Sequence, residues 1–177
     1  MKLAAIFFLL MPMIAVAQHS PYTGQQSREI KSLSPDEIKQ YLAGAGMGYA
    51  KPAELNGYPG PMHVLDLADA LALTASQRET IGNLMKTHKS EARSIGERVI
   101  REERELEKLF RQGNADPAVL KNQVGKAALI QGEYRLSHLE THRQMHALLT
   151  PIQIERYNEL RGYNAITHEG SGHHSSH

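Results

Sequence analysis

The chain has 177 residues, 20 basic and 19 acidic, with ten histidines and neither cysteine nor tryptophan. The lack of cysteine excludes disulfides and thiol chemistry, and the near-zero net charge argues against a nucleic-acid partner or a polybasic membrane-binding surface. Because aromatic residues make up only 6%, the core must be built from Leu, Ile, Val, Met and Ala. This composition favours an all-α protein.

The first 17 residues have the pattern of a cleaved signal peptide. Lys2 precedes an uncharged stretch over 3–16, and Ala15-Val16-Ala17 is a small-x-small cleavage site. The uncharged stretch is shorter than the roughly 20 residues that span a bilayer. We therefore expect export to the periplasm with cleavage after Ala17. No cysteine follows the apolar stretch, so no lipid anchor is expected.

The segment 18–61 is expected to contain little regular structure. Residues 18–33 are polar and predict a mobile arm. Residues 34–37 (Ser-Pro-Asp-Glu) place Ser at the N-cap, Pro at N1 and Glu at N3 of a short helix that ends at Gly44. The chain from Gly44 to Pro61 is dense in Gly and Pro, which predicts a loop in which residues 51–55 can form one helical turn.

The segment 62–162 is predicted to be a helical domain. A short amphipathic helix is expected over 62–71, followed by a long helix from about 75 to 110. Seam positions of the long helix recur at steps of four and three: Ile81, Met85, His88, Ala92, Ile95, Val99, Glu102, Leu106 and Leu109. The seam of the next helix is Leu120, Val124, Ala127, Gln131, Tyr134, His138, Thr141, Met145 and Leu148. The short turn between them, around Gly113 and Pro117, requires antiparallel neighbours, and thus a long helical hairpin.

The phrase Leu-Thr-x-x-Gln occurs twice, at the two ends of this hairpin. Its residues are Leu73, Thr74 and Gln77 in the first copy, and Leu149, Thr150 and Gln153 in the second. In each copy Thr is suited to the N-cap of a helix and Gln to the N3 position, where its side chain reaches back to the cap. The second copy opens a short helix that reaches about Arg161.

Together, the leader, the two phrases, the hairpin between them and the His-rich end resemble the Spy/CpxP superfamily of LTxxQ-motif periplasmic proteins. The resemblance covers residues 62–162. It implies an all-α helical hairpin with short flanking helices that dimerises into a curved cradle. One branch of the superfamily comprises ATP-independent chaperones and stress-response inhibitors. Another comprises heavy-metal resistance proteins and sensors that bind zinc, nickel, cobalt or copper.

The clearest group of candidate metal ligands is histidine. His138 and His142 are one helical turn apart, and folding the hairpin about its turn brings His88 opposite residue 139. We expect these three rings to converge, and three imidazoles suit Zn²⁺, Ni²⁺, Co²⁺ or Cu²⁺. The alternative is that they are structural residues with hydrogen-bonded rings. Weaker candidates are His146 and Met145, and His168, His173, His174 and His177 in a disordered tail over 163–177.

The sensor branch carries a His-x-x-x-His pair on an earlier helix, which this chain lacks. The leading interpretation is therefore a periplasmic chaperone-like or envelope-stress protein that binds unfolded proteins as a homodimer. Four of its seven methionines (Met47, Met62, Met85 and Met145) either form an adaptable apolar surface or fill the core. A heavy-metal binding or sensing protein is the alternative, and a partner domain of a membrane sensor is a third possibility.

Neither a required cofactor nor an enzymatic activity is expected. The sequence contains no nucleophile elbow, no phosphate-binding glycine loop before a helix and no HExxH pattern.

Overall fold

The computed structural model describes residues 20–163, and their regular structure consists of α-helices alone. The six helices are α1 (Pro35–Ala43), α2 (Lys51–Glu54), α3 (Pro61–Asp66), α4 (Ala75–Arg111), α5 (Pro117–Leu148) and α6 (Pro151–Leu160). The predicted all-α class is confirmed. Within this range no helix is both long and apolar enough to cross a bilayer. The predicted signal peptide and residues 164–177 of the predicted tail lie outside the described residues.

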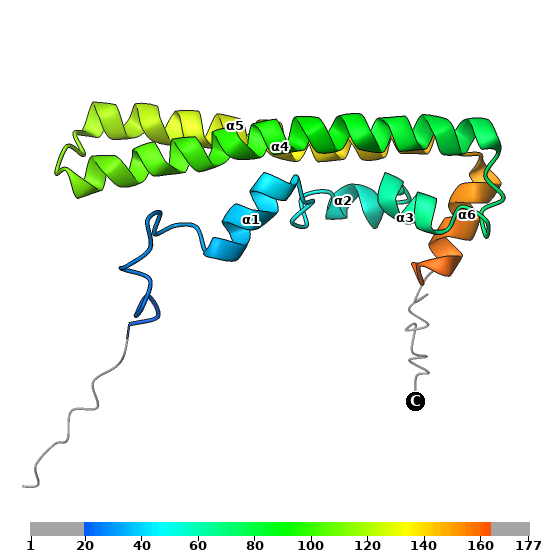
Figure 1. Cartoon of the computed structure of the whole chain (residues 1–177), viewed down its shortest axis with the longest axis horizontal. Coiled ribbons are helices and arrows are strands. Elements are labelled where there is room, and N and C mark those ends of the chain that lie inside the picture. The colour runs from blue at the N-terminus through cyan, green and yellow to red at the C-terminus, as the bar shows by residue number, and fades with distance from the viewer. Residues whose placement is uncertain (1–19, 164–177) are drawn as a thin grey trace, which may run out of the picture.

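The predicted long hairpin is the frame of the molecule. Helices α4 and α5 run antiparallel, α1–α3 lie along one side of them, and α6 turns away at the open end (Figure 1). Helix α4 has 37 residues and is about 55 Å long at about 1.5 Å per residue. At the closed end, Gly113 adopts a left-handed conformation (φ 68°), and the Asp116 side chain caps α5 by accepting from the Ala118 and Val119 amides.

Two apolar clusters hold the shorter segments against the hairpin. The first joins α1 and the residues before it to the middle of the hairpin, through Ile30, Leu33, Tyr41, Ala92, Ile95, Val99, Ile100, Ile130 and Tyr134. The second closes the open end, through Val64, Ala68, Leu71, Leu73, Ile81, Met145, Leu149 and Tyr157. Both clusters draw on both long helices, so burial of α1–α3 stabilises the pairing of α4 with α5.

Helix α1 crosses α4 at Gly96, which lies on a face that the seam pattern does not include. A Cβ built on Gly96 would lie 2.3 Å from the Tyr41 carbonyl oxygen, so only glycine permits this approach. Ile100 and Glu103 are buried on the same face. Helix α4 therefore buries two faces, one against α5 and one against α1.

The predicted seam of α5 is wrong at Val124, which is exposed, while Gln123 is buried instead. The Gln123 amide donates to the main-chain carbonyl and to the side-chain carboxylate of Glu102, at 3.0 and 3.1 Å. A polar side chain can replace an apolar one here because its hydrogen bonds are satisfied across the hairpin.

The segments before the hairpin differ from prediction in two places. The helix expected over 62–71 ends at Asp66, and the chain continues in turns in which Ala72 has a positive φ of 47°. The predicted mobile arm is packed at its end, since Ile30 is almost fully buried and Lys31 pairs with Glu107. Burial of a few apolar side chains fixes both stretches without a full helix.

The two LTxxQ phrases contact each other directly. Both form the predicted capping boxes, in which the Gln77 and Gln153 side-chain oxygens accept from the Thr74 and Thr150 amides. In addition, each Gln amide nitrogen donates to the other Gln's oxygen, at 2.9 and 3.1 Å. The remaining N–H groups donate to the Leu148 and Leu71 carbonyls. We call this reciprocal pair the glutamine clasp.

One substitution distinguishes the contribution of the clasp to stability from the contribution of the capping boxes. Gln77→Glu keeps a side-chain oxygen for the Thr74 amide, as glutamate does in capping boxes, but removes both donors and places a charge against the Gln153 oxygen. We expect a loss of about 2–3 kcal/mol in the free energy of unfolding, measured by urea denaturation, because partly buried acceptors lose their donors. Glu37→Gln, in the capping box of α1, is the control and should cost less than about 1 kcal/mol. Equal losses would contradict a role for the clasp beyond capping.

Candidate functional site

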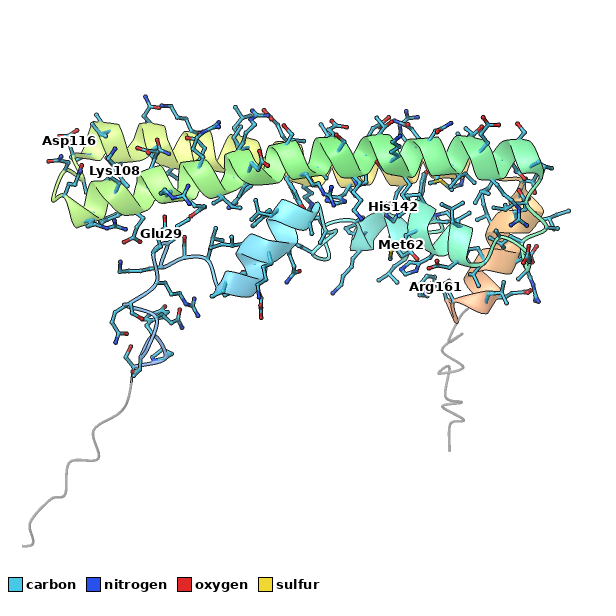
Figure 2. All side chains as sticks on the ribbon, viewed as in Figure 1. Glu29, Met62, Lys108, Asp116, His142 and Arg161 are labelled. Carbon is cyan, nitrogen blue, oxygen red and sulfur yellow. The ribbon has the colours of Figure 1, made fainter. Side chains whose placement is uncertain are left out.

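A cavity of about 520 Å³ lies between the hairpin and the α1–α3 segment. The glycine-rich stretch after α1 forms one wall, and α4 and α5 form the other. His142 and Met62 lie where the two walls meet, and Arg161 lies towards α6 (Figure 2). The side chains in this inner cavity that can ligate metals are Met47, Glu54, Met62, His63, Met85, His88, His138 and His142.

His88 and His138 form a buried imidazole pair, as the hairpin register predicts. His88 Nε2 and His138 Nδ1 are 3.0 Å apart, so one ring donates to the other. The second nitrogen of each ring, His88 Nδ1 and His138 Nε2, is buried without a hydrogen-bond partner. Since a neutral imidazole carries one N–H, either tautomer leaves one of these two nitrogens as a buried, unpartnered lone pair.

Burial keeps both rings of the pair uncharged. His138 is only 4% exposed. Burial, followed by the neighbouring positive charges of His88 and His142, lowers the pKa of His138 to about 4. Burial and the charge of His142 also lower the pKa of His88. At neutral pH the pair thus presents lone pairs rather than positive charge.

His142 is held apart from the pair by the loop before α3. Its Nδ1 donates to the Tyr58 carbonyl at 2.8 Å and lies 3.6 Å from the Glu54 carboxylate. Gly60 permits this approach, because a Cβ there would lie 3.0 Å from the His142 ring. Among residues 20–163, no three His, Asp or Glu side chains are grouped to hold a metal ion. The predicted convergence of the three histidines on one point is therefore not observed.

The weaker candidates lie elsewhere. The His146 ring stacks on Tyr58, with centroids 4.5 Å apart. Met145 is fully buried in the apolar cluster at the open end. His168, His173, His174 and His177 fall outside the described residues.

Sequence reasoning missed Glu54, which joins α2 to α6. Its carboxylate accepts from the Tyr157 and Tyr163 hydroxyls and from the Gly60 amide, and Arg161 lies 3.8 Å away. Burial, and then the hydrogen bond to Glu54, raise the pKa of Tyr157. No spacing in the sequence links Glu54 to Tyr157, since the contact spans more than a hundred residues.

The opposite side of the hairpin carries a shallow groove of about 1210 Å³ between α4 and α5. Leu84 and Leu136 line this outer groove, and Leu129 lies two helical turns before Leu136 on the same face of α5. Leu129 and Leu136 are 64% and 63% exposed. Gly132 lies one turn from each and adds no side chain, so both leucines stand clear of the helix surface. Leu84, Leu129 and Leu136 are called the outer apolar surface.

Comparison with known proteins agrees with the two phrases and the hairpin. The sequence model described as LTXXQ motif family protein matches residues 61–161, more than half of the chain. The chain belongs to the LTXXQ motif family. No curated protein and no solved structure matches it. Family membership supports a periplasmic protein of the Spy/CpxP type in general terms.

The neutral histidine pair predicts that stability falls with acidification. The unfolded chain binds protons on His88 and His138 below about pH 6.5, whereas the folded chain resists protonation of His138 to about pH 4. The contribution of the uncharged pair to the free energy of unfolding is complete above pH 6.5 and is lost as the pH falls below that value. We expect the free energy of unfolding to drop by roughly 1–2 kcal/mol between pH 7.5 and pH 5, measured by urea denaturation with EDTA present.

Between pH 7.5 and pH 5 the loss of stability comes from the histidines and not from the carboxylates. Glu37 and Glu107 have lowered pKa values, so their contribution is lost only as pH falls below about 4.5. His138→Asn should be less stable at pH 7.5 and should lose less stability on acidification. A wild-type free energy of unfolding that is flat from pH 7.5 to pH 5 would contradict the neutral pair.

Proposed function

We propose that this chain is a periplasmic, ATP-independent chaperone-like protein that binds apolar segments of unfolded proteins. The observation that carries the proposal is the outer apolar surface, in which Leu129 and Leu136 stay exposed on one face of the long helix α5. The leader pattern of residues 1–17 and the family support a periplasmic location.

The outer surface suits loose, reversible binding rather than a single specific ligand. Full burial of a leucine side chain is worth about 1.5–3 kcal/mol, so two leucines give a useful but weak attraction. Lys86, Arg98, Glu133 and Glu140 line the groove beside them, and Arg98 pairs with Glu133 across the two helices at 2.7 Å. Charges of both signs would keep the free protein soluble while a client's apolar side chains contact the leucines.

The proposal predicts that lysines on the outer surface abolish protection of a client. The Leu129→Lys/Leu136→Lys variant should need at least tenfold more protein than wild type to suppress aggregation of a chemically denatured client, because the apolar contact is lost. Light scattering without ATP measures the effect.

The matched control carries the same added charge at exposed polar positions away from this surface. It is Gln40→Lys/Gln112→Lys, which should stay within twofold of wild type. Circular dichroism verifies that both variants are folded. If the leucine variant protects the client as well as the control does, the outer surface is not the client site.

We also propose that the chain forms a homodimer through its long helices, because the hairpin leaves apolar side chains uncovered. Sedimentation equilibrium should give twice the monomer mass at high micromolar concentration. A monomer at that concentration would contradict the dimer without bearing on client binding, which the aggregation assay measures separately.

A further inference from the structure

The inner cavity combines two features that client binding on the outer surface does not use. One is the buried His88–His138 pair with its unpartnered ring nitrogens. The other is a set of methionines that line the cavity: Met85 on the α4–α5 wall with the histidines, Met47 on the facing wall, and Met62 where the walls meet. Met85 precedes His88 by one turn of α4, which places the two side chains on one face of the helix. We propose that His88, His138 and Met85 bind a soft monovalent cation, Cu(I) or Ag(I).

The donor atoms select this class of ion. Thioether sulfur and neutral imidazole nitrogen are soft to borderline ligands, which favour Cu(I) over the hard cations that carboxylates and water bind. Each neutral ring has one bare nitrogen. An ion between the rings is held by His88 Nε2 and His138 Nδ1 once the donor ring carries its proton on its other, unpartnered nitrogen. The proton moves within one imidazole, and none has to leave the protein. Met47 and Met62 line the same cavity and offer further sulfur atoms.

Charge around the cavity favours an ion of low charge. Lys51, Lys89 and Arg161 line it, and the one carboxylate among its lining residues in the range 20–163, Glu54, already accepts from tyrosine hydroxyls. A divalent ion beside uncharged ligands and these cations would meet twice the repulsion and a larger desolvation cost than a monovalent one.

The rings need only a small adjustment to hold an ion between them. Metal–imidazole bonds of about 2.0 Å place two ligating nitrogens up to about 4 Å apart, against 3.0 Å in the hydrogen-bonded pair. Met62 is 52% exposed, so its thioether offers a first contact from solvent.

Calorimetric titration with silver nitrate in chloride-free buffer tests the proposal. The protein carries His168→Ala, His173→Ala, His174→Ala and His177→Ala, so that the terminal histidines do not contribute heat. Met85→Leu, which keeps an apolar side chain but removes the sulfur, should weaken Ag(I) binding at least tenfold. Met145→Leu is the matched control, because Met145 lies in the other apolar cluster, and it should bind as the parent does.

Two further measurements complete the test. Zn²⁺ should bind at least tenfold more weakly than Ag(I). In ¹⁵N spectra of the parent protein, the ring signals of His88 and His138 should shift on addition of Ag(I), a readout that needs no histidine variant to fold. Parent-like binding by Met85→Leu, unchanged signals from both rings, or equal affinity for Zn²⁺ would each overturn the proposal.

Discussion

The reciprocal hydrogen bonds between Gln77 and Gln153 determine how the rest of the chain is arranged. Gln77 completes the cap of α4 and Gln153 that of α6, and each donates both amide hydrogens across the open end. Because Gln77 donates to the carbonyl of Leu148 at the end of α5, α4 cannot shift along α5 without losing hydrogen bonds. The Gly113 turn fixes the closed end. A hairpin held at both ends has one register, and this register brings His88 to His138.

The layer formed by α1–α3 gives the two sides of the hairpin different chemistry. On the covered side, Gly96 and Gly60 allow the backbone and a histidine ring to approach closely, and the cavity left there holds imidazoles and thioethers. On the uncovered side, Leu129 and Leu136 remain exposed above a groove with charged walls. One hairpin therefore presents a cavity that contains imidazoles and thioethers on one side and exposed leucines on the other, without a second domain.

Local patterns in the sequence predict most of the helical hairpin, but few of the contacts that hold the other segments against it. Capping residues and seam spacing predict the long helices and their direction, because these depend on neighbours within a few turns. The position of the turn between the two helices then predicts the approach of His88 to His138. The second buried face of α4, the partners of Glu54 and the orientation of His142 depend on contacts between distant segments. Val124 illustrates the limit, since Gln123 replaces it in the interface through hydrogen bonds that hydropathy cannot reveal.

The two sides of the hairpin meet at His88 and Thr141. Both residues line the inner cavity and the outer groove, so the partition between the two spaces is a single layer of side chains. Thr141 satisfies its hydroxyl within α5, by donating to the Ser137 carbonyl, and does not fix His88. The position of the His88 ring rests on one hydrogen bond to His138 and on packing. Because protein interiors are closely packed, an ion that separates the two rings must also displace the floor of the outer groove.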